Sequence, residues 1–163
     1  MTLRLQFGKV CPDGYKILLG LKKYLDGSSL DERLHKLIEI RASMSNGCAY
    51  CVDTHFREAI AIEESPRRLI SLSTWQEAAC FSERERAVLA FTDEVTAMGP
   101  DGVSDPTWEA LETFFSQEEV ADILLAIVTI NSFNRLAVTT HMVPAGAPGL
   151  IPEDSAAPAQ ATV

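Results

Sequence analysis

The sequence has little positive charge. Its 163 residues include 14 Lys and Arg against 23 Asp and Glu, which gives a formal net charge of −9. Such a chain has no basic surface with which to displace counterions from nucleic-acid phosphates, and it gains no attraction from an anionic membrane. The composition therefore argues against nucleic-acid and membrane partners and favours a soluble protein.

Long hydrophobic runs are also missing. Purely apolar stretches, such as ILLAIV at residues 123–128, are far shorter than the ~20 residues that a membrane-spanning helix needs. The opening segment, MTLRLQFGKV, has no uninterrupted apolar stretch of the kind that forms a secretory signal peptide. We therefore expect a cytoplasmic protein, and stable disulfides are rare in that compartment.

Strands are not predicted, because no segment alternates convincingly between polar and apolar residues. Apolar residues recur at helical spacing instead, and the pattern predicts an all-α fold. The segment at residues 120–130 is apolar on almost every side, so the helix that contains it is expected to be central. The predicted helices span residues 13–26, 29–45, 48–63, 66–77, 83–98, 106–115 and 117–141.

Helix starts are marked by capping residues. Ser29, Ser82 and Ser116 each stand three positions before a Glu, which is the spacing of a capping box. Ser65 and Asp105 each precede a proline, a residue that suits the first turn of a helix.

The helices form one predicted domain over residues 1–143, since the chain is long enough for a single sizeable core. From residue 144 to 163 the sequence is rich in Pro and Ala. This tail is expected to be mobile or to lie on a neighbouring subunit.

Cysteine and histidine are scarce, with four Cys and three His, yet residues 45–55 (SNGCAYCVDTH) hold Cys48, Cys51 and His55. Residues three and four apart share one face of a helix, so these three side chains are expected to form one stripe. Gly47 breaks the preceding helix, and Ser45 or Asn46 is expected to cap the next one. Cys48 would then lie in the first turn, where the helix dipole favours a thiolate.

Three interpretations of this stripe are open. The cysteines could form a redox pair, with His55 taking or returning a proton. They could bind zinc together with His55, if Cys11, Cys80 or His141 supplied a fourth ligand. They could also be small packing residues of the core. The combination of the CxxC spacing, the helix break and the histidine favours the redox pair.

The segment LIEIRASMSNGCAYCVDTHFREAI, residues 37–60, resembles the core motif of AhpD-like alkylhydroperoxidases, within the carboxymuconolactone decarboxylase superfamily. FSERERAVLAFTDEVT and FFSQEEVADILLAIVTINSFNRLAV also match one subgroup, so the resemblance covers roughly residues 10 to 140. It implies an all-helical AhpD-like domain that assembles into trimers or hexamers. It also implies a cofactor-free, thiol-dependent peroxidase or disulfide-exchange activity.

The resemblance also implies roles for single residues. Cys51 would attack the hydroperoxide and become a sulfenic acid, Cys48 would condense with it to a disulfide, and His55 would belong to the proton relay. An external dithiol, such as a lipoyl or thioredoxin-like reductant, would then reduce the pair. The helix dipole favours Cys48 as the more acidic thiol, but we follow the resemblance and assign the attack to Cys51.

The chain departs from the family pattern at Lys36, where the best-known members have a glutamate twelve residues before the first cysteine. Glu39, one turn further on, is the candidate to replace that carboxylate in the relay. Glu32, one turn back, is expected to cap a helix. This departure leaves open a disulfide reductase without strong peroxidase activity, or a zinc-stabilised assembly module. A decarboxylase is disfavoured, because family members with that chemistry lack the CxxC.

The remaining polar residues are predicted to have structural roles. Asn131, Asn134 and Arg135 lie on an apolar helix and are expected to bind backbone groups of neighbouring helices or of another subunit. Arg41 is expected to bind the last carbonyls of its own helix. Tyr50 is expected to pack at a subunit contact, and Cys11 and Cys80 are expected to be unpaired packing thiols. His35 and His141 are expected to lie at the surface or in the ordinary core.

Overall fold

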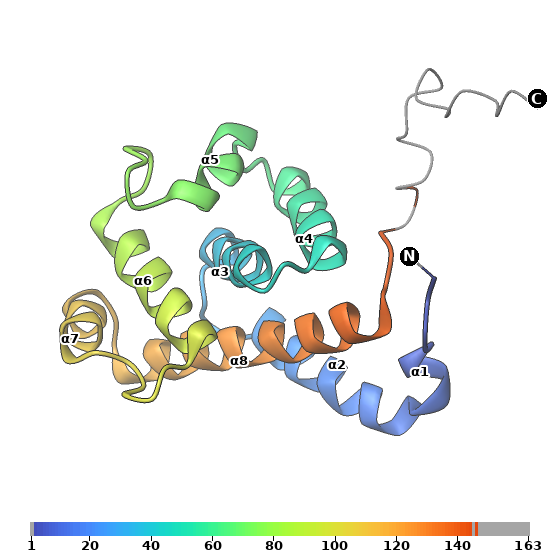
Figure 1. Ribbon diagram of the computed structural model, residues 1–163. Coiled ribbons are helices and arrows are strands. Elements are labelled where there is room, and N and C mark those ends of the chain that lie inside the picture. Colours follow the sequence, from blue (N-terminus) through green and yellow to red (C-terminus); the bar gives the residue numbers. More distant parts are fainter. Residues whose placement is uncertain (1, 145, 147–163) are drawn as a thin grey trace, which may run out of the picture.

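The computed structural model describes residues 2–144 and 146, and this part of the chain is helical with no strand, which confirms the predicted all-α class (Figure 1). Most of the predicted tail, from 147 onward, lies outside the described residues. The elements are α1 Phe7–Val10, α2 Pro12–Asp26, α3 Glu32–Ser45, α4 Ala49–Ala61, α5 Pro66–Ser71, the 3₁₀ turn η1 Leu72–Thr74, α6 Glu83–Ala97, α7 Asp105–Phe114 and α8 Gln117–Thr140.

The capping predictions are confirmed at α6 and α8. Ser82 and Ser116 each accept a bond from the backbone N–H three residues on, and the Glu at that position bonds back to the cap. Ser65 likewise precedes α5, with a proline in its first turn.

The predicted start of α3 at Ser29 is wrong. Asp31 caps this helix instead, and its Oδ1 accepts a bond of 2.9 Å from Leu34 N. Ser28 closes a turn before it, since its Oγ donates to Leu25 O and accepts from Leu30 N. Residues 27–31 therefore form the turn between α2 and α3, and α3 begins only after it.

Three further features of the helices differ from prediction. Ser104, and not Asp105, is the residue before α7. The single helix predicted over 66–77 is divided into α5 and η1. The four-residue helix α1 was not predicted, because one turn is too short to show a periodic pattern.

The centre of the domain is α3, which packs against α4, α6 and α8 (Figure 1). Leu37, Ile38 and Ile40 on this helix are fully buried. The prediction that α8 is central is wrong in part: Ile123 and Ile127 are fully buried, but Val128 and Val138 on its other side are exposed. Both faces of α3 are therefore covered, whereas α8 presents an apolar face to solvent.

The length and composition of α8 would allow it to cross a membrane. Half of its most apolar window is buried inside the protein, however, and the core helix of a soluble domain has the same character. Packing against α3, α6 and α2 thus explains the buried half of its apolar residues.

Candidate active site

The junction between α3 and α4 places the cysteines. Gly47 has a φ of +65°, a left-handed conformation that glycine adopts without steric cost, and it turns the chain between the two helices. Cys48 is itself the cap of α4, and its Sγ accepts a bond of 3.3 Å from Cys51 N. The predicted cap at Ser45 or Asn46 is therefore wrong, and Cys48 lies one position before the first turn.

Two asparagines on α8 hold this junction in place. Asn46 Nδ2 donates to Asn131 Oδ1 and to Asn134 Oδ1, each at 2.9 Å, and Asn134 Nδ2 donates to Ser43 Oγ at 2.9 Å. Arg135 binds Asn131 on the same helix. Asn131 and Asn134 thus bind side chains of neighbouring helices, whereas the prediction was that they bind neighbouring backbones.

Cys48 and Cys51 are joined as a disulfide, with their Cα atoms 5.4 Å apart. Both are almost fully buried, at 1% and 3% exposure, and they pack in an apolar cluster with Ala42, Ile130 and Ala137. The two sulfur atoms predicted to lie close together on one helix face are therefore bonded to each other.

The other two cysteines, Cys11 and Cys80, are free, as expected, but they are exposed, so the expectation that they are packing residues is wrong. In this state Cys48 and Cys51 bind each other and do not offer the thiolates that a structural zinc site requires.

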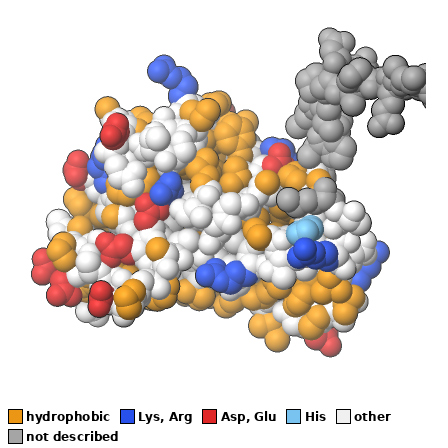
Figure 2. All heavy atoms as spheres, viewed as in Figure 1, with side chains coloured by type: hydrophobic (Ala, Val, Ile, Leu, Met, Phe, Trp, Pro, Cys, Tyr) orange, Lys and Arg blue, Asp and Glu red, His pale blue; other side chains and the backbone are white. Residues whose placement is uncertain are grey.

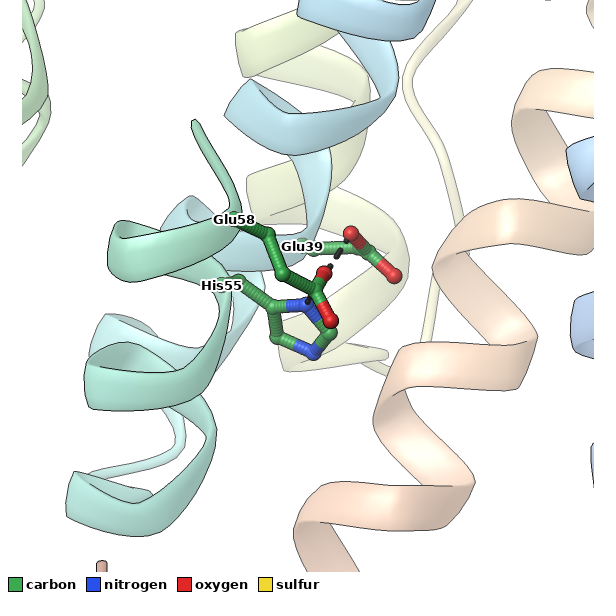
Figure 3. Close-up of side chains that lie close together, drawn as sticks. All are labelled: Glu39, His55 and Glu58. Carbon is green, nitrogen blue, oxygen red and sulfur yellow. Dashed lines mark hydrogen bonds and ion pairs between the residues drawn. The ribbon is translucent and has the colours of Figure 1, made fainter. Parts of the chain in front are cut away.

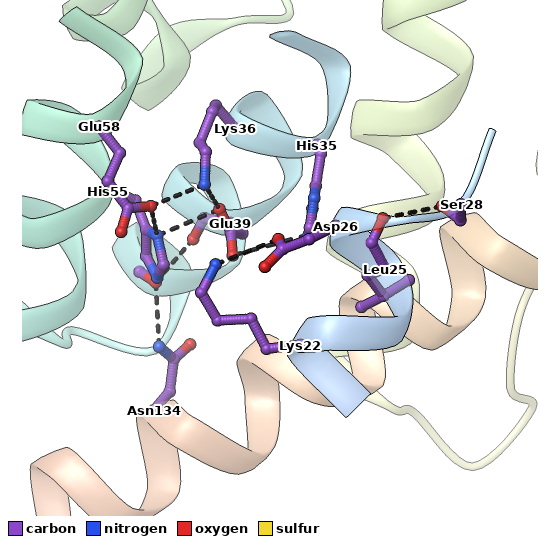
Figure 4. A network of polar contacts seen from close by, with 11 residues as sticks. Lys22, Leu25, Asp26, Ser28, His35, Lys36, Glu39, His55, Glu58 and Asn134 are labelled. Atoms are coloured by element: carbon purple, nitrogen blue, oxygen red, sulfur yellow. Dashed lines mark hydrogen bonds and ion pairs between the residues drawn. The ribbon is translucent and has the colours of Figure 1, made fainter. Parts of the chain in front are cut away.

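His55 lies four residues after Cys51 on α4 and points into a cluster of charges (Figure 3). Its Nδ1 is 3.0 Å from Glu58 Oε2 and 3.1 Å from Glu39 Oε2. Lys36 Nζ contacts the same two oxygen atoms, at 2.6 Å from Glu58 and 2.7 Å from Glu39 (Figure 4). Two cationic groups therefore face two carboxylates.

The cluster shifts the acidity of its members. The hydrogen bond from His55 lowers the pKa of Glu58 to about 2, against the opposing effect of burial, and Lys36 adds to the shift. Burial alone would raise the pKa of Glu39 and lower that of His55, but the hydrogen bonds and opposite charges around each group together outweigh burial. The pKa of Glu39 is lowered and that of His55 is raised. The ionised cluster is neutral overall when His55 is protonated.

Of the predicted site residues, the structure brings together Cys51, Cys48, His55 and Glu39, and it adds two that were missed. Lys36 was expected only to weaken the relay, yet its ammonium binds both carboxylates. Glu58 was not singled out at all, although its position three residues after His55 on one helix is a signal that could have identified it.

A second histidine also belongs to this region. His35 is buried and its Nε2 lies 3.6 Å from Glu39 Oε1, so it is neither a surface nor an ordinary core residue as predicted. Burial lowers its pKa, which favours the neutral ring. The predicted bonds of Arg41 to its own helix end are also wrong, because this guanidinium binds Asp93 and Leu72 O.

Glu39, His55 and Glu58 have the donor atoms and the spacing to hold a metal ion, since their ligand atoms lie within 4.8 Å of one another. The position between the two carboxylates is already taken by Lys36 Nζ, however. The Lys36 ammonium thus balances the negative charge of the two carboxylates, as a bound metal ion would.

Two cavities meet at Cys51. An inner cavity of about 170 Å³ is lined by Cys51 together with His55, Glu39 and Glu58. A mostly apolar groove of about 350 Å³ is lined by Cys51 and, near the N-terminus, by Leu3 and residues 5–9. Tyr15, Tyr50 and Phe133 border both spaces. A third and more polar hollow, of about 550 Å³, is lined by His35, Lys36 and Glu58 but not by either cysteine.

Comparisons with known proteins give relatives of this chain and of its fold. The protein YdfG of Bacillus subtilis, which is uncharacterised, is 32% identical over 138 residues, covering 85% of this chain and 94% of that protein. A protein of unknown function from Agrobacterium tumefaciens, for which an AhpD role in antioxidant defence has been suggested, has a similar crystal structure. Its TM-score is 0.86 at 36% identity, with 88% of this chain and 98% of that chain covered.

The debrominase Bmp8 also has this fold, with a TM-score of 0.75 at 23% identity, covering 88% of this chain and 76% of that one. At that identity the likeness extends to the fold alone.

The fold and the site together define an AhpD-like helical domain with a CxxC pair beside a buried histidine. The sequence profile of the carboxymuconolactone decarboxylase family matches residues 12–94. The chain therefore belongs to the carboxymuconolactone decarboxylase family, as the resemblance of its core motif implied.

Proposed function

We propose that the protein is a thiol-dependent peroxidase that reduces hydroperoxides through Cys51 and Cys48. The observation that carries this proposal is the buried Cys48–Cys51 pair, with Cys51 and His55 lining one cavity. The raised pKa of His55 supports it, because an imidazolium beside Cys51 stabilises the thiolate that must attack.

The oxidative half-reaction starts from the two reduced cysteines. The Cys51 thiolate attacks the outer oxygen of the hydroperoxide, the O–O bond breaks, and the imidazolium of His55 gives its proton to the leaving alkoxide. Cys51 is then a sulfenic acid and the first product is an alcohol. Cys48 attacks the Cys51 sulfur, forming the disulfide and releasing water. Two thiols are oxidised and one peroxide bond is reduced.

The reductive half-reaction needs an external dithiol, which we infer to be a lipoyl or thioredoxin-like group. Its thiolate attacks one sulfur of the disulfide, and its second thiol then resolves the mixed disulfide. Both enzyme thiols are restored and the reductant leaves oxidised.

The apolar groove beside Cys51 supports organic hydroperoxides as substrates. It has space for an apolar substituent next to the sulfur that would attack, and its lining includes Leu5, Phe133 and Met142. We expect kcat/KM to be higher for cumene hydroperoxide than for hydrogen peroxide, as coupled dithiol-dependent assays can measure.

The test is a thiol titration with and without peroxide, followed by mass mapping. The reduced wild-type protein is expected to lose two thiols, and the linked peptides should contain Cys48 and Cys51. The Cys51→Ser variant is expected to lose turnover, while Cys80→Ser, at an exposed free thiol, serves as the matched control.

Full dithiol-dependent turnover by Cys51→Ser would overturn the assignment. Turnover of a disulfide substrate without turnover of peroxide would instead show the disulfide reductase that the sequence left open. Stoichiometric zinc with blocked thiols in the purified protein would favour the assembly module.

A further inference from the structure

Glu58 and Glu39 reach the same nitrogen of His55 but are held differently. His55 Nδ1 lies 3.0 Å from Glu58 Oε2 and 3.1 Å from Glu39 Oε2, so both carboxylates are within hydrogen-bond distance of this nitrogen. Glu58 stands three residues after His55 on α4, so the two side chains share one face of the same helix. Glu39 comes from α3, and its position depends on the packing of two helices.

Lys36 fixes the Glu58 carboxylate from the other side. Its Nζ lies 2.6 Å from Glu58 Oε2, the same oxygen that bonds to His55 (Figure 4). The Glu58 side chain is 38% exposed and would otherwise be free to turn towards solvent, while Lys36 is 8% exposed. A largely buried ammonium therefore keeps a half-exposed carboxylate on the imidazole.

We propose that Glu58 is the positioning residue of the site: it holds His55 with a proton on Nδ1 and leaves Nε2 to exchange a proton with Cys51. This inference rests on the proposed function, in which Cys51 is the attacking thiol. A carboxylate accepts hydrogen bonds and cannot donate them, so the nitrogen that faces it must carry the proton. A carboxylate plays the same part beside the histidine of serine hydrolases.

The proton balance of the site follows from this arrangement. The Cys51 thiol gives its proton to His55 Nε2, which produces a thiolate and an imidazolium. The imidazolium returns that proton to the alkoxide when the O–O bond breaks. Nδ1 keeps its proton and Glu58 stays ionised throughout, so neither step requires a proton from solvent.

The Glu58 carboxylate contacts few of the charged groups that surround it. Charged and titratable groups from three helices line the cavities beside it, and of these Lys36 and His55 contact its carboxylate. These groups are, from α2, Tyr15, Lys22 and Asp26; from α3, Glu32, His35, Lys36 and Glu39; and from α4, Tyr50, Cys51 and His55.

The test uses Glu58→Gln and Glu58→Asp, with Glu32→Gln as the matched control. Glu32 lines the same polar hollow as Glu58 but has no hydrogen bond or ion pair to the described residues. In a Cys48→Ser background, iodoacetamide labelling of Cys51 is followed against pH by peptide mass mapping. A second readout, the nitrogen NMR shifts of His55 in the disulfide form, reports which ring nitrogen carries the proton.

Glu58→Gln is expected to slow Cys51 labelling at pH 7 roughly tenfold, the effect of a one-unit change in acidity. Its His55 spectrum should show less of the Nδ1–H form, because one of the two carboxylates at this nitrogen is replaced by a neutral amide, which binds that proton less strongly. Glu58→Asp should restore part of both properties, and Glu32→Gln should match the wild type. Thermal melting confirms that each variant is folded.

The proposal is overturned if Glu58→Gln keeps the wild-type labelling profile and His55 spectrum, or if Glu39→Gln alone produces both changes. Failure of the proposed function looks different. A wild-type protein that never reduces peroxide, but whose His55 spectrum changes in Glu58→Gln, would refute the peroxidase and leave the role of Glu58 intact.

Discussion

Lys36 shows how one side chain changes the electrostatics of the site. It stands where the AhpD-like pattern has a glutamate, and a lysine there removes a carboxylate from the relay. The structure places its ammonium between Glu39 and Glu58, at 2.7 and 2.6 Å. These carboxylates now face His55, so the local balance of charge is kept with different residues.

Lys36→Met is expected to destabilise the protein by roughly 3 kcal/mol, because it leaves the buried Glu39 carboxylate without its ammonium. Urea unfolding measures this loss. Lys22→Met is the control, since Lys22 pairs with Asp26 near the surface and should change the free energy of unfolding by under about 1 kcal/mol. Equal effects of the two substitutions would contradict the buried ion pair.

At the scale of elements, the turn between α3 and α4 determines where the disulfide lies. Gly47 reverses the chain with a left-handed φ, and the bonds from Asn46 to Asn131 and Asn134 tie the turn to α8. The rigid part of the site is therefore a junction of three helices, not a single helix.

Gly47→Ala is expected to cost about 1–2 kcal/mol, because a side chain at φ +65° is strained even where space is free. Gly99→Ala is the matched control: an added methyl group also meets nothing within 4 Å there, and its φ is not in the left-handed region. Chemical denaturation compares the two. An equal and small cost at both positions would show that the turn relaxes without strain.

At the scale of the molecule, the charged cluster makes stability depend on pH. Glu39 and Glu58 have lowered pKa values in the folded protein, so their contribution is present above the ordinary value of 4.5 and is lost as pH falls below it. His55 has a raised pKa, so its contribution is present below 6.5 and is lost as pH rises through the folded-state value. His35, with a lowered pKa, loses its contribution as pH falls below 6.5.

Urea unfolding between pH 4 and 9 should therefore show that the stability of the wild type declines in alkali. His55→Gln is expected to remove the part of this decline that follows the imidazole, since its side chain does not titrate. An unchanged alkaline slope in the variant would mean that His55 does not bind its proton more tightly in the folded state.

Exposed apolar residues lead us to expect an oligomer in solution. Figure 2 shows hydrophobic side chains gathered over α1 and α2, where Val10 and Ile17 are 67% and 72% exposed. Val128 and Val138 on α8 are exposed as well. Soluble proteins seldom leave large apolar patches uncovered. Sedimentation should give a trimer or a hexamer, and a stable monomer at micromolar concentration would contradict this expectation.

The sequence alone determined the helical class, most helix starts and the cysteine stripe, because these depend on contacts within a few residues. Capping boxes and the CxxCxxxH spacing act along one helix, so they can be read without the fold. Glu39 was proposed in another way, from the family resemblance, as the carboxylate one turn after Lys36.

Only the tertiary structure decided what surrounds that stripe. Lys36 and Glu58 lie 22 residues apart, and the amides of Asn131 and Asn134 reach Asn46 from 85 and 88 residues away. Such pairs form when α3, α4 and α8 pack together, because a charged group that becomes buried needs a partner of opposite charge. No periodic pattern in the sequence predicts these contacts between helices, because they result from the free energy gained when the packing of three helices excludes water.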